Sequence, residues 1–74
     1  MDWIEHHGRG YPFDREDADG NPIAAPMVLV CLACRSREKV LAKAEWHPAD
    51  WWPRWRWDGD TPGPGDIVAY MVKE

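Results

Sequence analysis

Two apolar stretches dominate the pattern of hydrophobic and polar positions, Met27 to Arg35 and Ile67 to Val72. They read M-V-L-V-C-L-A-C-R and I-V-A-Y-M-V, so both alternating faces of an extended chain are apolar in each. Short continuous apolar runs of this kind predict strands that are covered on both sides. We therefore expect the closing strand to lie in the middle of a sheet or inside a small closed barrel.

The segment between these stretches is harder to assign. R-S-R-E forms a polar break, after which K-V-L-A-K-A-E-W runs from Lys39 to Trp46. Its residues are fair helix formers, but seven or eight residues before a His-Pro pair are short for a helix. We therefore predict a strand, which makes residues 27–46 a hairpin.

A further strand is predicted at residues 54–57, where R-W-R-W alternates tryptophan with arginine. Residues 1–26 form an N-terminal arm with an acidic, proline-containing loop, and residues 58–66 are glycine- and proline-rich turn sequence. The last two strands then occupy residues 54–72. The predicted fold is a single all-β domain of residues 1–74: a small curled antiparallel sheet or partly closed barrel of three to five short strands with an N-terminal arm.

The composition limits how many large side chains the interior can hold. The chain has 74 residues and six tryptophans, and a domain of this size has one thin core. Trp55 and Trp57 lie on one face of the predicted strand, and Trp3 of the arm is expected to plug the end of the core. Trp46, Trp51 and Trp52 then exceed what the core can use.

The charge is unevenly distributed along the chain. The formal net charge is −4, but residues 21–57 carry six bases and three acids, whereas the flanking segments are acidic. An acidic protein without a long Lys/Arg run is a poor partner for nucleic-acid backbones. A basic patch within it instead favours a small anionic ligand or an acidic spot on a protein. No apolar run reaches the roughly 20 residues of a membrane helix, so we expect no membrane partner and a cytoplasmic location.

The surplus tryptophans and the nearby arginines form the predicted binding site. Guanidinium groups bind phosphate or carboxylate in pairs of hydrogen bonds, and a tryptophan face accepts a nucleobase or an arginine. The alternatives are that the rings form a lid over the sheet edge and that the arginines are solvated and paired with nearby acids. An exposed patch of three tryptophans also favours contact with a protein partner or a second copy, so a homo-oligomer is expected. The predicted ligand-binding residues are Trp46, Trp51, Trp52, Arg37, Arg54 and Arg56.

No catalytic, metal or cofactor site is predicted. Cys31 and Cys34 form C-L-A-C without a second pair of ligands at zinc-binding spacing, so a buried thiol is favoured over a metal or redox role. His6 and His7 point in opposite directions in an extended chain, and no nucleophile or carboxylate pair accompanies them. We expect a protein that is not an enzyme.

The order of several short motifs resembles that of a group of short proteins from tailed-phage and prophage genomes. The motifs are D-W-I-E-H-H-G-R-G-Y-P, V-L-V, W-R-W and D-I-V-A-Y. The chain departs from the usual pattern where R-S-R-E replaces a glycine-containing turn, and in the aromatic insertion W-H-P-A-D-W-W-P. The resemblance transfers no catalytic residues.

The resemblance implies a setting, the cytoplasm of an infected bacterial host, and a binding role there. The function expected from it is capture of a small anionic or nucleotide-derived host defence signal. The alternative is inhibition of a host protein through the tryptophan cluster.

Overall fold

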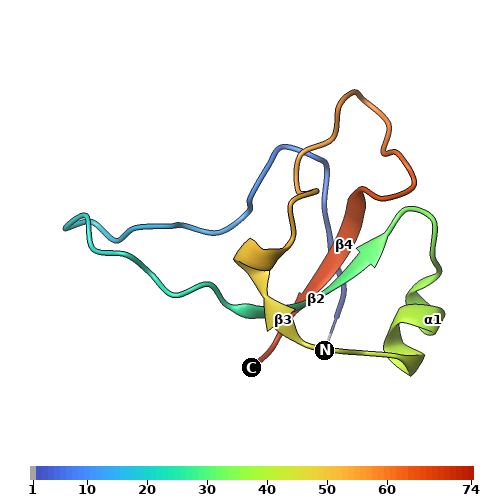
Figure 1. Cartoon of the computed structure of the whole chain (residues 1–74), viewed down its shortest axis with the longest axis horizontal. Helices are drawn as coiled ribbons and strands as arrows, with labels where there is room; N and C mark the ends of the chain where they lie inside the picture. Colours follow the sequence, from blue (N-terminus) through green and yellow to red (C-terminus); the bar gives the residue numbers. More distant parts are fainter. Residues whose placement is uncertain (1) are drawn as a thin grey trace.

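A four-stranded antiparallel sheet, in the order β1-β4-β2-β3, forms the centre of the computed structural model, which describes residues 2–74 (Figure 1). The strands are β1 (Ile4–Glu5), β2 (Met27–Leu32), β3 (His47–Pro48) and β4 (Ile67–Val72). One short helix, α1 (Arg37–Ala42), and one 3₁₀ turn, η1 (Ala49–Trp51), lie between β2 and β4. The all-β prediction is confirmed, and the sheet is open rather than closed into a barrel.

The closing strand β4 lies between β1 and β2, as its apolar sequence predicts. Tyr70 pairs with Ile4 on one side and with Val30 on the other. Both outer strands are only two residues long. Each outer strand therefore pairs with only part of the longer strand beside it.

The core on one face of the sheet is built around Trp55, which is 4% exposed. Its ring meets Tyr70 edge to face with centroids 5.3 Å apart, and its Nε1 donates to the Ala49 carbonyl at 2.8 Å. Tyr11 and Phe13 from the arm pack against the same ring. The predicted inner position of Trp55 is therefore confirmed, and the arm contributes two aromatic rings to the core.

Trp57 and Trp3 differ in how far they meet the prediction. Trp57 is half-buried, and its Nε1 donates to the Ile67 carbonyl at 2.9 Å. Trp3 is also half-buried but is not among the side chains that pack against the core cluster. The prediction that Trp3 plugs this core is therefore wrong, and the arm residues that pack against the cluster are Tyr11, Phe13 and Ala25.

The predicted hairpin over residues 27–46 is wrong in its second arm. The first strand ends at Leu32, and residues 37–42 form helix α1. Ser36 is the N-cap, and its Oγ accepts a hydrogen bond from the Lys39 N–H. Arg37 also forms an ion pair with Glu5 of β1. The cap and this tertiary contact stabilise a helix that is too short to be stable alone.

The segment 54–57 is not a strand. Its only bridge pairs Arg56 with Arg9, outside the sheet. Arg54 accepts a hydrogen bond from Ile67 through its carbonyl, and Trp57 N–H donates to Gly8. The backbone of the segment is thus shared between two different neighbours, so no regular ladder forms.

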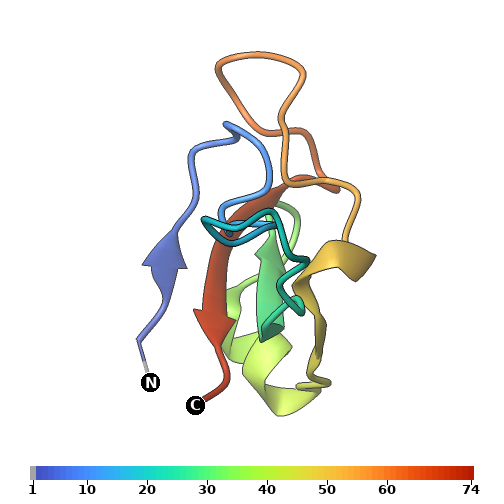
Figure 2. The same cartoon turned by 90° about the vertical axis from the view of Figure 1, so that its left-hand side faces the viewer.

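The sheet separates α1 from the arm, which lies across the other face and extends beyond it (Figure 2). Residues 14–24 are all exposed. Asp17 closes the tip by accepting hydrogen bonds through Oδ1 from the N–H groups of Asp19 and Asn21. The tip therefore stabilises its own turn and contributes nothing to the core.

Candidate functional site

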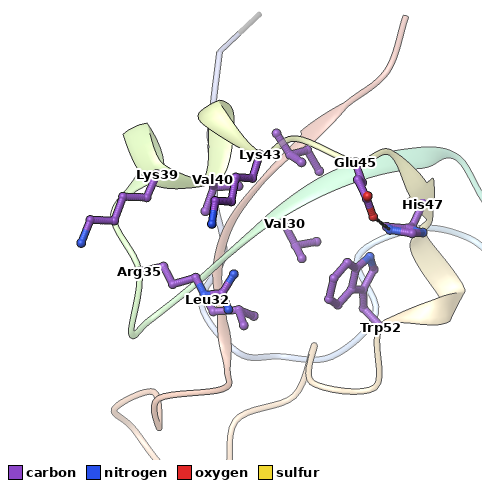
Figure 3. Close-up of a pocket in the computed structure, with 10 residues that line it drawn as sticks. Val30, Leu32, Arg35, Lys39, Val40, Lys43, Glu45, His47 and Trp52 are labelled. Atoms are coloured by element: carbon purple, nitrogen blue, oxygen red, sulfur yellow. Dashed lines mark ion pairs between the residues drawn. The ribbon is translucent and has the colours of Figure 1, made fainter.

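A cavity of about 190 Å³ lies between α1, β2 and the chain around β3 (Figure 3). Its apolar surface comes from the sheet and from Val40 of α1, and its rim carries charged side chains. The lining residues are Leu29, Val30, Leu32, Arg35, Lys39, Val40, Lys43, Glu45, His47 and Trp52.

Three cations stand on the rim of this cavity: Arg35, Lys39 and Lys43. Lys39 lies in α1 and Lys43 is the C-cap residue of the same helix. None of the three forms an ion pair with an acidic residue within residues 2–74. They also line a second hollow on the far side of the rim, together with Cys34 and Ala42. The lining residues thus include three cations without an ion-pair partner and one acid, Glu45.

Trp52 forms the aromatic wall of the cavity and faces Val30 (Figure 3). Its Nε1 is buried and has no hydrogen-bond partner. Its ring neighbours are Trp51 and His47, both edge to face, with centroids 5.3 and 5.8 Å away. A buried donor without an acceptor costs roughly 1–3 kcal/mol, so this indole adds less to stability than its area suggests.

Glu45 and His47 close the cavity on the side of β3. The Glu45 Oε2 lies 3.5 Å from the His47 Nε2. His47 also stacks against Trp51 with centroids 4.2 Å apart, and Trp51 meets Trp52 at 5.3 Å. His47, Trp51 and Trp52 therefore form one aromatic cluster, of which Trp51 is the exposed outer member at 61%.

The structure does not bring the six predicted ligand residues together. Trp52 lines the cavity and Trp51 lies beside it, whereas the half-buried Trp46 does not line it. Arg37 is paired with Glu5.

The other two predicted arginines lie elsewhere. Arg54 binds Asp66 through Nε and Nη2, at 3.0 and 2.9 Å. Arg56 lies with Arg9, His7 and Trp57 along a different, open hollow. Of the six predicted residues, Trp52 alone therefore lines the basic cavity.

Sequence reasoning missed Lys39, Lys43, Glu45 and His47 as lining residues. The sequence did indicate that the two lysines lie together, because residues four apart share a side in a helix and also in a strand. The pattern K-V-L-A-K therefore placed both lysines together under either assignment. The arginines drew attention instead because of their bidentate geometry.

The cysteines differ in environment. Cys31 is buried, and its Sγ lies 3.5 Å from the Arg35 carbonyl oxygen, whereas Cys34 is exposed in the turn after β2. Burial raises the pKa of the Cys31 thiol. The predicted burial is therefore confirmed for Cys31 and wrong for Cys34. Within residues 2–74 no three His, Cys, Asp or Glu side chains converge as metal ligands would.

The two histidines near the N-terminus do not act together. His6 is buried, and its Nε2 is hydrogen-bonded to the Trp55 carbonyl. His7 is exposed and lines the hollow beside Arg9 and Arg56. His6 therefore has a structural role, as a buried side chain that is hydrogen-bonded within the core.

In the part of the chain that the structure describes, no helix has the length and apolar character to cross a bilayer. Comparison with protein-family models, with curated proteins and with solved structures gave no match to this chain.

Proposed function

We propose that this protein is a non-enzymatic binding protein that captures a small anionic ligand in the cavity between α1 and β2. The observation that carries the proposal is the set of three cations without acidic partners, Arg35, Lys39 and Lys43, around an apolar floor. An anion at this rim is attracted by all three positive charges. The Trp52 wall and the aliphatic floor provide area for an apolar part of the same ligand.

The resemblance to tailed-phage proteins gives this proposal a biological setting. A binder made during infection would lower the free concentration of a host signal, and a nucleotide-derived defence signal carries the negative charge that the rim favours. The proposed location is the cytoplasm of the infected bacterium. Self-association is part of the proposal, with the exposed Trp51 as a contact.

The test is a titration of the purified protein with inorganic phosphate, ribose 5-phosphate and mononucleotides. Binding is measured by isothermal titration calorimetry and by the change in tryptophan emission. Lys39→Gln and Lys43→Gln are each expected to weaken binding about three- to tenfold, because each removes one charge-assisted contact. Glu45→Gln is expected to strengthen it about two- to threefold, because it removes the acid from the cavity wall.

Lys73→Gln is the matched control, since Lys73 is an exposed lysine outside the cavity. It changes the net charge by the same amount, so its affinity is expected to equal that of the unaltered protein. Equal effects of Lys43→Gln and Lys73→Gln would contradict a site at the cavity, because only overall charge would then matter.

A second candidate function is binding of a host protein through the aromatic cluster. The observation that favours it is the 61% exposure of Trp51, whose ring stacks on His47. Large rings of this kind are common at the centres of protein interfaces. Trp51→Ala would then abolish capture of the partner in a pull-down from host lysate, whereas Lys43→Gln and added nucleotide would leave it unchanged.

A further inference from the structure

The cavity lies beside an unfinished part of the sheet. β3 pairs with the first two residues of β2, through Met27 with Pro48 and Val28 with His47. The same register would place Glu45 opposite Val30, but β3 begins at His47 and Glu45 lies outside the ladder. The β3 side of β2 is therefore open at Val30.

The hydrogen bonds of the ladder fix the direction of the Val30 main chain. Lys73 N–H donates to the Met27 carbonyl at 2.8 Å, so Val28 and Val72 form a pair without direct hydrogen bonds. Two residues on, Val30 and Tyr70 form the next pair of the same kind. The N–H and C=O of Val30 therefore point away from β4 and towards the open side, where no residue of β3 lies opposite.

The cavity occupies that open side. The Leu29 and Val30 side chains point to opposite faces of the sheet, yet both residues line the cavity. Val40 and Lys43 reach it from the face that carries α1, and Trp52 reaches it from the core face. A hollow bounded from both faces lies alongside the strand, level with its free backbone groups.

We propose that the ligand is an anion that carries a planar ring with an adjacent hydrogen-bond donor and acceptor, the pattern of a nucleobase in a mononucleotide. The ring occupies the position that a longer β3 would fill and exchanges two hydrogen bonds with the N–H and C=O of Val30. Trp52 flanks the ring, and the phosphate lies at Arg35, Lys39 and Lys43. This inference rests on the proposed function, because it takes the cavity as the ligand site.

The size of the cavity agrees with one ring. Sites for drug-sized ligands usually measure about 300–1,000 Å³, and this cavity measures about 190 Å³. It holds a single ring system while the charged group stays at the rim. A ligand with two bases would leave the second base outside.

The experiment is amide NMR and hydrogen exchange on the ¹⁵N-labelled protein with inorganic phosphate, ribose 5-phosphate, and the monophosphates of adenosine, guanosine, cytidine and uridine. At least one nucleotide is expected to shift the Val30 amide resonance and slow its exchange, and to bind about tenfold more tightly than ribose 5-phosphate. Methylation of that base on its donor edge is expected to remove the advantage. Trp52→Leu is expected to weaken binding of the nucleotide and not of phosphate. Trp3→Leu is the control, because Trp3 is a half-buried tryptophan that does not line the cavity.

The outcomes separate this inference from the proposed function. If phosphate, ribose 5-phosphate and all nucleotides bind equally, with the Val30 amide unaffected and Lys43→Gln still weakening them, the inference is overturned and the anion site stands. If none of the probes binds, both are overturned. If Trp52→Leu does not fold, the Val30 amide of the unaltered protein decides.

Discussion

Trp52 and Trp55 carry the same indole N–H, but only Trp55 has an acceptor for it. Trp55→Phe removes one of the two hydrogen bonds that the Ala49 carbonyl accepts, the other coming from the Trp52 main-chain N–H, and leaves a gap in the core. We therefore expect it to lower the free energy of unfolding by about 2–4 kcal/mol. Trp52→Phe removes a donor that is already unpaired, which offsets part of the lost ring area, and is expected to cost less than about 1 kcal/mol. Urea denaturation of both variants measures the difference, and equal losses would mean that the Trp52 N–H has an acceptor.

The cysteines allow a second test at the same scale. Cys34 is exposed, whereas Cys31 is buried and its pKa is raised by desolvation. We expect Ellman's reagent to titrate one thiol per chain rapidly near neutral pH and the second only after unfolding. Cys34→Ser should remove the rapid reaction, and Cys31→Ser should leave it. Two rapid thiols in the native protein would show that the end of β2 opens easily.

The burial of an individual residue could be predicted from the sequence where its size and apolar character decided its position. Trp55 is large and apolar, and it alternates with arginines, so its burial follows from the pattern. The partners of the arginines did not follow, because Arg37 with Glu5 and Arg54 with Asp66 are tertiary pairs 32 and 12 residues apart. The sequence alone suggested only acids close to the arginines along the chain as their partners.

At the scale of elements, α1 depends on its N-cap. Ser36 Oγ accepts from the Lys39 N–H at 3.3 Å, and the helix has only six residues. Ser36→Ala is expected to lower the free energy of unfolding by about 1 kcal/mol, and Ser36→Asp, which preserves the cap, should restore it. Because Lys39 and Lys43 depend on the same helix, ligand affinity should fall with Ser36→Ala and recover with Ser36→Asp. An unchanged affinity in Ser36→Ala would mean that the cap does not position the rim.

The loop before β4 is anchored by Asp66, which is 2% exposed. Its carboxylate accepts from the Gly63 N–H at 2.8 Å and from Arg54. The Gly63 hydrogen bond lowers the pKa of Asp66 below its ordinary 3.8, burial opposes this, and Arg54 lowers the pKa further. A carboxylate with a lowered folded-state pKa contributes stability above about pH 4 and loses it as the pH falls towards the folded-state pKa.

Asp66→Asn tests this anchor. The variant is expected to be less stable than the unaltered protein near neutral pH, and the difference should shrink steadily below about pH 4. Denaturation in guanidinium chloride at a series of pH values measures it. A difference that stays constant down to about pH 2 would mean that the ionisation of Asp66 does not contribute.

Strands β2 and β4 were predictable because both of their faces are covered, which leaves a continuous apolar run. Helix α1 was not, because a helix of six residues is below the length at which propensity decides, and its stability comes from the cap and from Glu5. The open edge of β2 at Val30 had no signal either, since it depends on where β3 begins. The cavity therefore could not be predicted from local patterns, although its lysines were visible in K-V-L-A-K.

At the scale of the whole molecule, the arm has a base in the core and a free tip. Replacing residues 17–21 with Asn-Gly should leave the free energy of unfolding within about 0.5 kcal/mol, because residues 14–24 are exposed. Phe13→Ala, at the base, should cost about 2 kcal/mol or more, since its ring packs on Trp55 and Tyr70. Thermal and urea denaturation check both. A large loss from the shortened tip would indicate that it contacts another copy in solution.

The central position of β4 has a kinetic consequence. Ile4 and Tyr70 are neighbours in the sheet but stand near opposite ends of the sequence, and Val30 reaches the same residue across forty positions. Neither pairing of β4 can begin until residues 67–72 have been synthesised, so a nascent chain that ends before them has no strand between β1 and β2. Loops of this length must close before any stabilising contact forms between these strands. The entropy cost of closing them slows folding. We therefore expect the sheet to form in one late, cooperative step, slowly for a chain of this length.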